Sequence, residues 1–385
     1  MYICHSKISK SLKIVLVGTA NPYRGGGIST FNERLALEFQ LQGHDIVIYN
    51  FTLQYPNFLF PGTSQYKDVP TEDVVPTYRK VNTINPFNWI KIGWELYKMK
   101  PDMILFRYWI SFMAPCFGVI AMIAKLNGVS TIYSIIDNVV PHEKRFFDTL
   151  FTKFFISACD QFLIMNKTSQ SDLMKLTQKP ILLEPHPIYD NFGDIESMDV
   201  SRKKLQLDSE DFIVLFFGFI RDYKGLDLIL EAMADESIKA KRIKLLVAGE
   251  FYGNEEFYMN LYKKLGLENI IWRTEFIKDD DVKYYFGASN CVILPYKNAT
   301  QSGITQVAFH FLKPMIATNV GGLGDFVKDN YIGYLTEPNP SSLAHTILKY
   351  VQENKELEFI EHLKVEKKLY SWERFVKRII ETIVR

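Results

Sequence analysis

Two stretches of this chain repeat the same order of elements, and that repetition limits the folds open to it. The first stretch opens with the short apolar run 13–18, followed by a glycine-containing loop and a helical pattern. The second opens in the same way, with the apolar run 212–217 and a loop that ends at Gly225. Short apolar runs that alternate with amphipathic helices are typical of a parallel sheet covered by helices on both faces.

Further apolar runs continue this alternation, at residues 45–49, 103–106, 130–136, 161–165, 244–248, 269–272, 291–294 and 315–318. Residues 180–193 interrupt it with three prolines and Gly193, which is typical of a linker. At 385 residues the chain is also too long for a single core of ordinary size. We therefore expect two doubly wound, Rossmann-like α/β domains that face each other across a cleft, at 1–190 and 191–370. The amphipathic stretch 371–385 is expected to cross back onto the first domain.

The charge balance and the cysteines indicate which partners and which cellular compartment to expect. Lys plus Arg number 45 and Asp plus Glu number 44, so nothing in the net charge indicates a nucleic-acid partner. The four cysteines are scattered without a CxxC pair, which favours free thiols in a reducing compartment. Residues 1–12 show no long apolar export signal, and we expect a cytoplasmic location.

Two segments raise the question of membrane contact. The apolar stretch 109–124 contains Ser111, Pro115 and Gly118 and falls short of the roughly 20 residues needed to span a bilayer. We expect a buried helix there, and the alternative is shallow contact with a membrane. The helical pattern 144–156 mixes basic and aromatic residues, which indicates either core packing with a solvated face or docking on an anionic membrane. The two alternatives are therefore a cytoplasmic protein without membrane contact and one attached peripherally to the inner face of the membrane.

The segment 295–311 combines a polar loop with the start of an amphipathic helix. Beginning at Ile304, four apolar residues recur at i, i+3, i+4 and i+7, which is one face of a helix. Thr300 or Ser302 is placed to cap this helix, and Gly303 falls in its first turn. A helix start offers unpaired N–H groups and the positive end of the helix dipole, so this is where a nucleotide's diphosphate could bind.

Two other glycine-containing loops are candidates for phosphate contact. The loop 217–225 carries Arg221 and Lys224 between a buried strand and a helix, and such cations suit phosphate oxygens. The alternative is a pair of solvated surface charges. In the loop 24–28, Gly26 and Gly27 allow a close backbone approach to a ligand, although a plain structural turn is the competing interpretation.

Polar residues also follow the strand expected at 130–136. Asp137 and His142 lie in a short run that ends at Glu143, so an acid, an amide, an imidazole and a second acid come within seven residues. This is the best place for substrate hydroxyls to be held, and structural roles are the alternative. By contrast, the acids at 279–281 precede a helical pattern, so a helix N-terminus explains them better than a metal does.

Taken in order and spacing, these segments resemble retaining glycosyltransferases of family 4, over nearly the whole chain. The segments that carry the resemblance are 25–27, 137–143, 186–190, 218–228, 248–250, 299–303 and 314–323. The resemblance implies the GT-B architecture, a nucleotide-sugar donor lying mainly on the second domain and an acceptor on the first. It also implies that neither a metal nor another cofactor is required.

The resemblance assigns roles to individual residues. Arg221 and Lys224 correspond to the diphosphate-binding cations, and the backbone around Ser302, Gly303 and Ile304 to the helix start that meets the phosphates. The expected donor-binding set is completed by Gly26, Gly27, Glu250, Thr300 and Gln301. The expected catalytic set comprises Asp137, His142, Arg221 and Lys224.

The chain departs from the family at three positions. The family commonly has two glutamates separated by seven residues, and here Ala299 and Val307 stand in their places. Ile136 stands where a histidine is usual near the donor sugar. An Ala-Thr-Gln-Ser-Gly version of the donor loop is therefore expected, in which Thr300, Gln301 and Gln306 act as partial substitutes.

The resemblance favours a bacterial glycosyltransferase that adds a sugar, with retention, to a glycan or lipid-linked acceptor in surface polysaccharide synthesis. A catalytically silent relative that binds nucleotide or glycan within an assembly complex is the main alternative. A nucleotide-sugar epimerase or a phosphorylase is a third interpretation. The base, the sugar, the acceptor and the linkage are not readable from the sequence.

Overall fold

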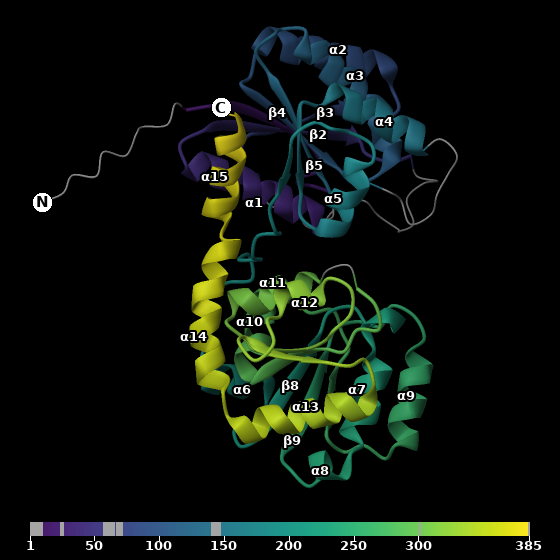
Figure 1. Cartoon of the computed structure of the whole chain (residues 1–385), viewed down its shortest axis with the longest axis vertical. Helices are drawn as coiled ribbons and strands as arrows, with labels where there is room; N and C mark the ends of the chain where they lie inside the picture. The colour runs from purple at the N-terminus through teal and green to yellow at the C-terminus, as the bar shows by residue number, and fades with distance from the viewer. Residues whose placement is uncertain are drawn as a thin grey trace, which may run out of the picture. The chain divides into compact units, whose positions relative to one another are not determined.

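A computed structural model of the chain describes residues 11–23, 27–56, 66, 72–139, 148–299 and 302–383. It divides into two compact units (Figure 1). The first comprises Met1–Pro185 and Trp372–Arg385, and the second His186–Ser371. The division after Pro185 lies inside the proline-containing segment that the sequence indicates as a linker, five residues before the boundary expected there.

The sheet of the first unit has seven strands in the order β3-β2-β1-β4-β5-β6-β7. Every neighbouring pair is parallel. The strands are β1 (Lys13–Val17), β2 (Asp45–Leu53), β3 (Thr77–Asn82), β4 (Met103–Tyr108), β5 (Thr131–Ile136), β6 (Gln161–Ile164) and β7 (Ile181–Leu183). Strand β4, in the middle, is buried at every residue, as expected where helices cover both faces of a sheet.

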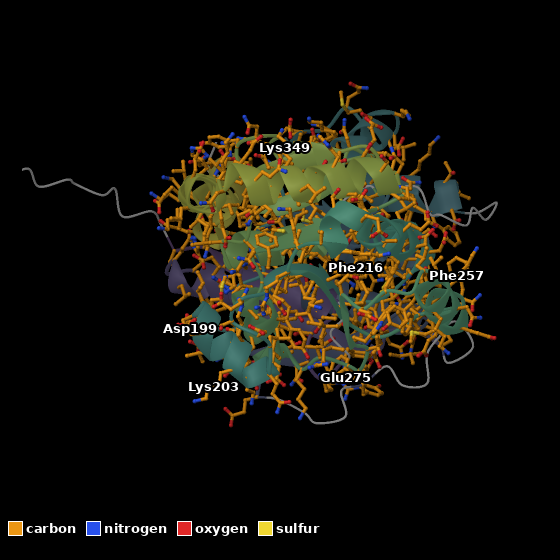
Figure 2. The ribbon with its side chains drawn as sticks, turned by 90° about the horizontal axis from the view of Figure 1, so that it is seen from below. Asp199, Lys203, Phe216, Phe257, Glu275 and Lys349 are labelled. Atoms are coloured by element: carbon orange, nitrogen blue, oxygen red, sulfur yellow. The ribbon has the colours of Figure 1, made fainter. Side chains whose placement is uncertain are left out.

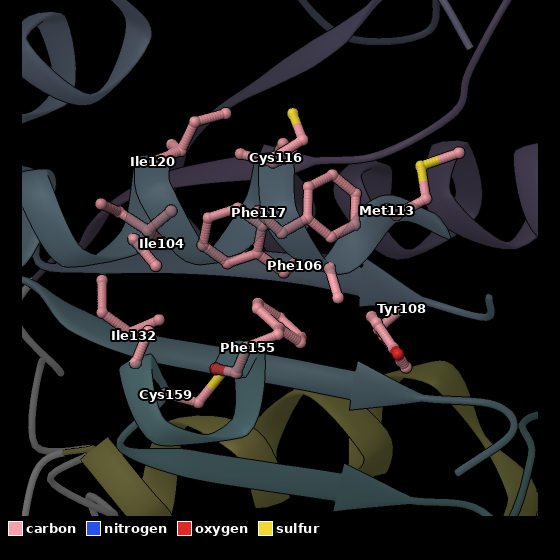
Figure 3. Close-up of a cluster of buried hydrophobic side chains, with 14 of the residues drawn as sticks. Ile104, Phe106, Tyr108, Met113, Cys116, Phe117, Ile120, Ile132, Phe155 and Cys159 are labelled. Carbon is pink, nitrogen blue, oxygen red and sulfur yellow. The ribbon is translucent and has the colours of Figure 1, made fainter. Parts of the chain in front are cut away.

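The described helices of the first unit are α1 (Ile28–Leu41), α2 (Pro86–Met99), η2 (Ser111–Met113), α3 (Ala114–Lys125), α4 (Asp148–Ala158), α5 (Lys167–Met174) and α15 (Trp372–Ile383). Side chains of α3 and α4 pack on β4 in an aromatic core (Figure 3). The ring of Phe106 lies 5.2 Å from that of Phe117 and 5.6 Å from that of Phe155, measured between centroids. By packing on β4, this core fixes the orientation of the strands. The polar residues predicted to contact substrate follow the carboxyl ends of these strands.

Helix α15 belongs to the first unit although it follows the whole second unit in sequence. Trp372 and Phe375 pack on Phe31 of α1, with ring centroids 4.9 and 5.8 Å apart. Arg374 and Arg378 pair with the buried carboxylate of Glu184, at 3.3 and 3.4 Å. The chain therefore passes between the units twice, once near Pro185 and once near Ser371.

The sheet of the second unit has six strands in the order β10-β9-β8-β11-β12-β13, again parallel throughout. They are β8 (Phe212–Phe217), β9 (Ile243–Ala248), β10 (Ile270–Arg273), β11 (Cys291–Leu294), β12 (Met315–Thr318) and β13 (Gly333–Thr336). The helices are α6 (Met198–Leu205), η3 (Asp222–Lys224), α7 (Leu226–Met233), α8 (Glu236–Lys239), α9 (Glu255–Lys264), α10 (Asp279–Ala288), α11 (Gly303–His310), α12 (Leu323–Phe326), α13 (Pro340–Glu353), α14 (Glu356–Lys367) and η4 (Lys368–Tyr370). Phe216 of β8 lies inside this unit, whereas Asp199, Lys203 and Glu275 lie at its exposed surface (Figure 2).

The structure also bears on the apolar stretch 109–124. It forms η2 and α3, and the face of α3 that carries Phe117, Ile120 and Ala124 is buried, which confirms the expected buried helix. Within the described ranges, no helix combines the length and the apolar character needed to cross a bilayer. Cys116, Cys159 and Cys291 are free buried thiols, as expected, and Cys4 lies outside the described residues.

Candidate functional site

The topology of the second unit brings two of the predicted loops to the same edge of the sheet. Strands β8 and β11 are hydrogen-bonded neighbours and run parallel, so the loops after their carboxyl ends start side by side. One loop carries Arg221 and Lys224, and the other leads from Pro295 to helix α11. In open parallel sheets, ligands bind outside the carboxyl ends of the strands.

Glycine lets these two loops pack closely. Gly225 has a φ of +68°, and a Cβ atom there would lie 1.9 Å from the carbonyl oxygen of Pro295. Gly218 has a φ of +91°, and its missing Cβ would lie 3.1 Å from the Lys224 Nζ atom and 3.3 Å from the Ile304 Cδ1 atom. The Lys224 ammonium and the first turn of α11 therefore both lie close to Gly218.

The cations at this edge differ in how their charges are balanced. Lys297 forms ion pairs of 2.8 and 2.9 Å with Asp222 and Asp227. Neither Arg221 nor Lys224 forms an ion pair with an acid of the described residues. Within the described residues, the two cations that correspond by resemblance to diphosphate ligands therefore have no acid as an ion-pair partner.

Lys224 is only 8% exposed, so keeping its ammonium group charged at this position costs free energy. Burial, and to a lesser degree the nearby Arg221 guanidinium, lowers the pKa of Lys224 from its usual 10.5 to about 8. Arg221 itself is exposed, with its Cζ atom 4.2 Å from the ring centroid of Tyr252. An anion bound between these groups would stabilise the protonated form of Lys224.

Helix α11 begins with the predicted cap. The Ser302 hydroxyl accepts a hydrogen bond from the Ile304 N–H at 3.2 Å, so Ser302 is the capping residue of the two considered. The same hydroxyl lies 3.0 Å from the hydroxyl of buried Tyr296. Because Tyr296 lies two residues after the end of β11, this contact ties the end of the strand to the helix start.

The remaining predicted site residues are less well defined. Gly26, His142, Thr300 and Gln301 lie outside the described residues. Gly27 immediately precedes α1. Glu250 is partly buried after β9, where its carbonyl oxygen accepts a hydrogen bond from the Ile220 N–H at 2.8 Å.

The positions that depart from the family are occupied by buried residues. The Ala299 carbonyl oxygen accepts a hydrogen bond from the Gly322 N–H at 3.1 Å. Val307 is buried, as its place in the apolar stripe of α11 predicts. Gln306, one proposed substitute, is 2% exposed, and its amide atoms make no hydrogen bond in the described structure.

In the first unit, Asp137 has a partner that the sequence analysis missed. Arg107 of β4 donates hydrogen bonds to both carboxylate oxygens of Asp137, Nε to Oδ2 at 2.8 Å and Nη2 to Oδ1 at 2.6 Å. The Arg107 side chain is 4% exposed, and its Cζ atom lies 3.9 Å from the ring centroid of Phe31. A charged residue in the apolar run 103–108 was the available signal.

The Arg107–Asp137 pair sets the electrostatics at this strand end. Burial raises the pKa of Asp137, and the charge and hydrogen bonds of Arg107 oppose that rise. The Arg107 Nη1 atom is buried and makes no hydrogen bond with the described residues. Asp137 is therefore held by a two-point contact at the carboxyl end of β5.

Within the described residues, no group of three or more His, Cys, Asp or Glu side chains could hold a metal ion. The acids at 279–281 form the first turn of α10, as the sequence indicates, where they complement the helix dipole.

Comparison with known proteins adds independent information. Residues 197–364, within the second unit, match the family model of the group 1 glycosyl transferases. An uncharacterized glycosyltransferase of Methanocaldococcus jannaschii is 30% identical over 165 residues, 42% of this chain and 45% of that protein. The lipopolysaccharide 1,2-N-acetylglucosaminetransferase of Salmonella typhimurium is 25% identical over 197 residues, 48% of this chain and 51% of that protein. The chain spans about half the length of the curated relatives it matches.

Solved structures match over nearly the whole chain. A glycosyltransferase from Rickettsia africae superposes with a TM-score of 0.70 at 17% identity, over 98% of this chain and 99% of that one. The Anabaena protein HepE, in complex with UDP, superposes with a TM-score of 0.71 at 14% identity, over 97% and 100%. These similarities and the two parallel sheets confirm the predicted fold, two Rossmann-like domains of the GT-B type.

Proposed function

We propose that this protein is a glycosyltransferase that takes a sugar from a nucleotide-sugar donor bound to its second unit. The observation that carries the proposal is the buried, uncompensated ammonium of Lys224 beside the start of helix α11. The match of residues 197–364 to the group 1 glycosyl transferases supports the same assignment.

A diphosphate meets the chemical requirements of this edge of the sheet. It carries the negative charge that Lys224 and Arg221 lack as a partner, and its oxygens suit the N–H groups at the start of α11. Lys297 is a poor alternative cation because two aspartates already neutralise it. Carboxylate ligands would satisfy the charge too, but the similarity of the chain to UDP-binding HepE favours a nucleotide.

The proposed chemistry follows from this charge arrangement. As the bond from the sugar to the diphosphate breaks, negative charge grows on the departing phosphate, and preorganised cations and N–H groups stabilise it. No metal ion is required for that stabilisation. Retention would follow from a front-face reaction in which the departing phosphate accepts the proton of the attacking acceptor hydroxyl.

The proposed acceptor is a glycan or a lipid-linked glycan, and the proposed setting is bacterial surface polysaccharide synthesis at the cytoplasmic side of the membrane. The similarity to a lipopolysaccharide transferase of Salmonella typhimurium supports this choice. Asp137 and His142 remain the predicted acceptor-side residues, and we propose that Arg107 positions Asp137 for that role.

A donor screen with a matched pair of variants tests the proposal. UDP-, GDP- and ADP-sugars are compared by thermal shift, and the true donor at a hundredfold excess over Kd should stabilise the protein by about 2.7 kcal/mol. Lys224→Ala should weaken donor binding roughly 10- to 100-fold, the usual cost of a lost charged hydrogen bond. Lys297→Ala removes a cation from the same edge and should leave binding nearly unchanged.

The outcomes separate the competing functions. Stabilisation by no sugar nucleotide, or equal losses in both variants, would contradict the proposed site. Donor binding without transfer or hydrolysis on any acceptor extract would favour a catalytically silent relative. Conversion of the donor in the absence of acceptor would indicate an epimerase.

A further inference from the structure

We propose that the first unit carries a glycan-binding groove between helix α2 and the edge strand β3. The groove, called here the α2–β3 groove, consists of two adjoining hollows of about 430 and 420 Å³. It shares no residue with the proposed donor site, so the proposal does not depend on the proposed function.

The first hollow opens where strands β1 and β2 begin. Lys13 and Asp45, the first residues of these strands, line it. Tyr49 of β2, Tyr78 of β3 and Met99 at the end of α2 complete this part of the groove. Because ligands of an open parallel sheet normally bind at the opposite, carboxyl ends of the strands, this hollow lies outside the site predicted for a substrate.

The second hollow continues the groove toward the other end of β3. It is lined by Asn82, the last residue of β3, and by Asn85 and Asn88 at the start of α2. Lys80 and Glu95 line both hollows, so the two adjoin. The groove therefore follows α2 over its 14 residues, about 21 Å, which is long enough for several sugar rings in a row.

Side chains of α2 fix the shape of the groove. The Asn88 carboxamide accepts a hydrogen bond from the Asn82 N–H at 2.8 Å and donates one to the Lys80 carbonyl oxygen at 2.9 Å. Glu95 pairs with the Lys80 ammonium and accepts a hydrogen bond of 2.6 Å from the Tyr49 hydroxyl. These contacts tie the helix to the edge strand, so a ligand would enter a preformed groove at a small cost in conformational entropy.

The groove offers an exposed aromatic ring. Tyr78 is 48% exposed and packs edge to face against buried Tyr49, with ring centroids 6.4 Å apart. The Lys80 Nζ atom lies 5.2 Å from the Tyr78 ring centroid, a second contact that holds the ring in place. An oriented ring that is half exposed can pack against the apolar C–H face of a sugar.

Charged groups of both signs line the groove. Lys13 and Asp45 form no ion pair within the described residues, so both can pair with a ligand. Burial raises the pKa of Glu95, but Lys80, with a contribution from Lys91, lowers it below its usual value. Ammonium, carboxylate and carboxamide groups are therefore all available along the same groove.

This mixture of groups favours an uncharged glycan over an anion. Each sugar hydroxyl both donates and accepts hydrogen bonds, so carboxylates, ammonium groups and carboxamides can all pair with it. A phosphate would instead meet the like charges of Asp45 and Glu95. The ligand that suits the whole groove is a neutral oligosaccharide, with one sugar ring on Tyr78 and further rings along α2.

Isothermal titration calorimetry on the full chain tests the proposal with linear hexasaccharides of glucose, galactose, mannose and N-acetylglucosamine, in the absence of nucleotide. At least one should bind, and more tightly than the corresponding disaccharide, because the longer chain can occupy both hollows. Tyr78→Ala should lower that affinity about tenfold, through the loss of a buried aromatic contact. Asp45→Ala with Lys91→Ala removes one charged group from each hollow and should also lower it about tenfold.

Matched controls come from the second unit. Phe257 is 47% exposed, close to the value for Tyr78, and Phe257→Ala should bind the hexasaccharide as the wild type does. Asp199→Ala with Lys203→Ala removes one exposed acid and one exposed lysine outside the groove and should also leave binding unchanged. Circular dichroism should show unchanged folding of every variant.

The proposal is overturned if no hexasaccharide of the panel binds, or if the groove variants bind as well as the controls. Displacement of the hexasaccharide by inorganic phosphate would contradict a groove for neutral glycans. Loss of binding in Lys224→Ala, or competition by a sugar nucleotide, would assign the oligosaccharide to the proposed donor site instead. Because this titration uses no nucleotide and the donor screen uses no oligosaccharide, either proposal can fail while the other stands.

Discussion

Each unit buries a cation at the carboxyl end of its sheet, but only one of the two has a counter-charge. Arg107 in the first unit holds both oxygens of Asp137. Lys224 in the second is also buried, with no acid of the described residues as its partner. A paired charge is compensated within the fold, whereas an unpaired one costs free energy until a ligand supplies the opposite charge. In the proposed function, the paired Arg107 therefore positions Asp137, whereas the unpaired Lys224 binds the donor.

The largest expected effect comes from breaking the paired cation. Arg107→Ala leaves the largely buried Asp137 carboxylate, whose side chain is 18% exposed, without its partner and should lower the free energy of unfolding by about 3–5 kcal/mol. Burial already raises the pKa of Asp137, so the loss should be greatest near neutral pH and shrink in acid, where Asp137 becomes protonated. Chemical denaturation at several pH values measures both effects. A loss of unfolding free energy below about 1 kcal/mol would contradict the interpretation of Arg107 and Asp137 as an ion pair that is compensated within the fold.

Removing the unpaired cation should have the opposite sign. Lys224→Met takes a buried charge out of the fold, so we expect the unliganded protein to gain about 1–3 kcal/mol at pH 7. The pKa of Lys224 is lowered to about 8 by folding, so the gain should be complete below pH 8 and disappear as the pH approaches 10.5. Denaturation without ligand tests this. Destabilisation of the unliganded variant would show that Lys224 has a structural partner.

The pH dependence of donor binding sharpens the same contrast. In the proposed site the ammonium form of Lys224 would bind the diphosphate, and burial lowers the pKa of Lys224 to about 8 in the free protein. Affinity should therefore be constant below that pH and fall above it, by up to about tenfold per pH unit. Calorimetric titration measures the slope. Lys224→Met serves as the control, because the slope should vanish in it.

The smallest effect is expected at the contact that supports the start of α11. Tyr296→Phe removes only the hydroxyl that lies 3.0 Å from the Ser302 hydroxyl. A hydrogen bond of this kind contributes about 0.5–1.5 kcal/mol, so donor affinity should fall about 2- to 13-fold with the fold intact. Calorimetry on the variant decides the point. An unchanged affinity would mean that the contact does not position the helix start.

Much of the fold and part of the site were predictable from local patterns. The alternation of apolar runs and amphipathic helices predicted both parallel sheets, and the cap at Ser302 followed from the residues around it. Arg107 was missed because an arginine inside an apolar run shows no partner until β4 and β5 pair.

By itself, the sequence determined the order of the elements, the two-unit organisation and the loops that carry Arg221, Lys224 and Ser302, because periodicity and capping act over a few residues. Only the tertiary structure decided which charges are compensated. Asp137 meets Arg107 from 30 residues away, and Lys297 meets Asp222 from 75 residues away. Such pairings depend on strand order, which brings distant loops to one edge of a sheet. Among the described residues of the proposed donor site, they leave the buried Lys224 without an acid as its partner.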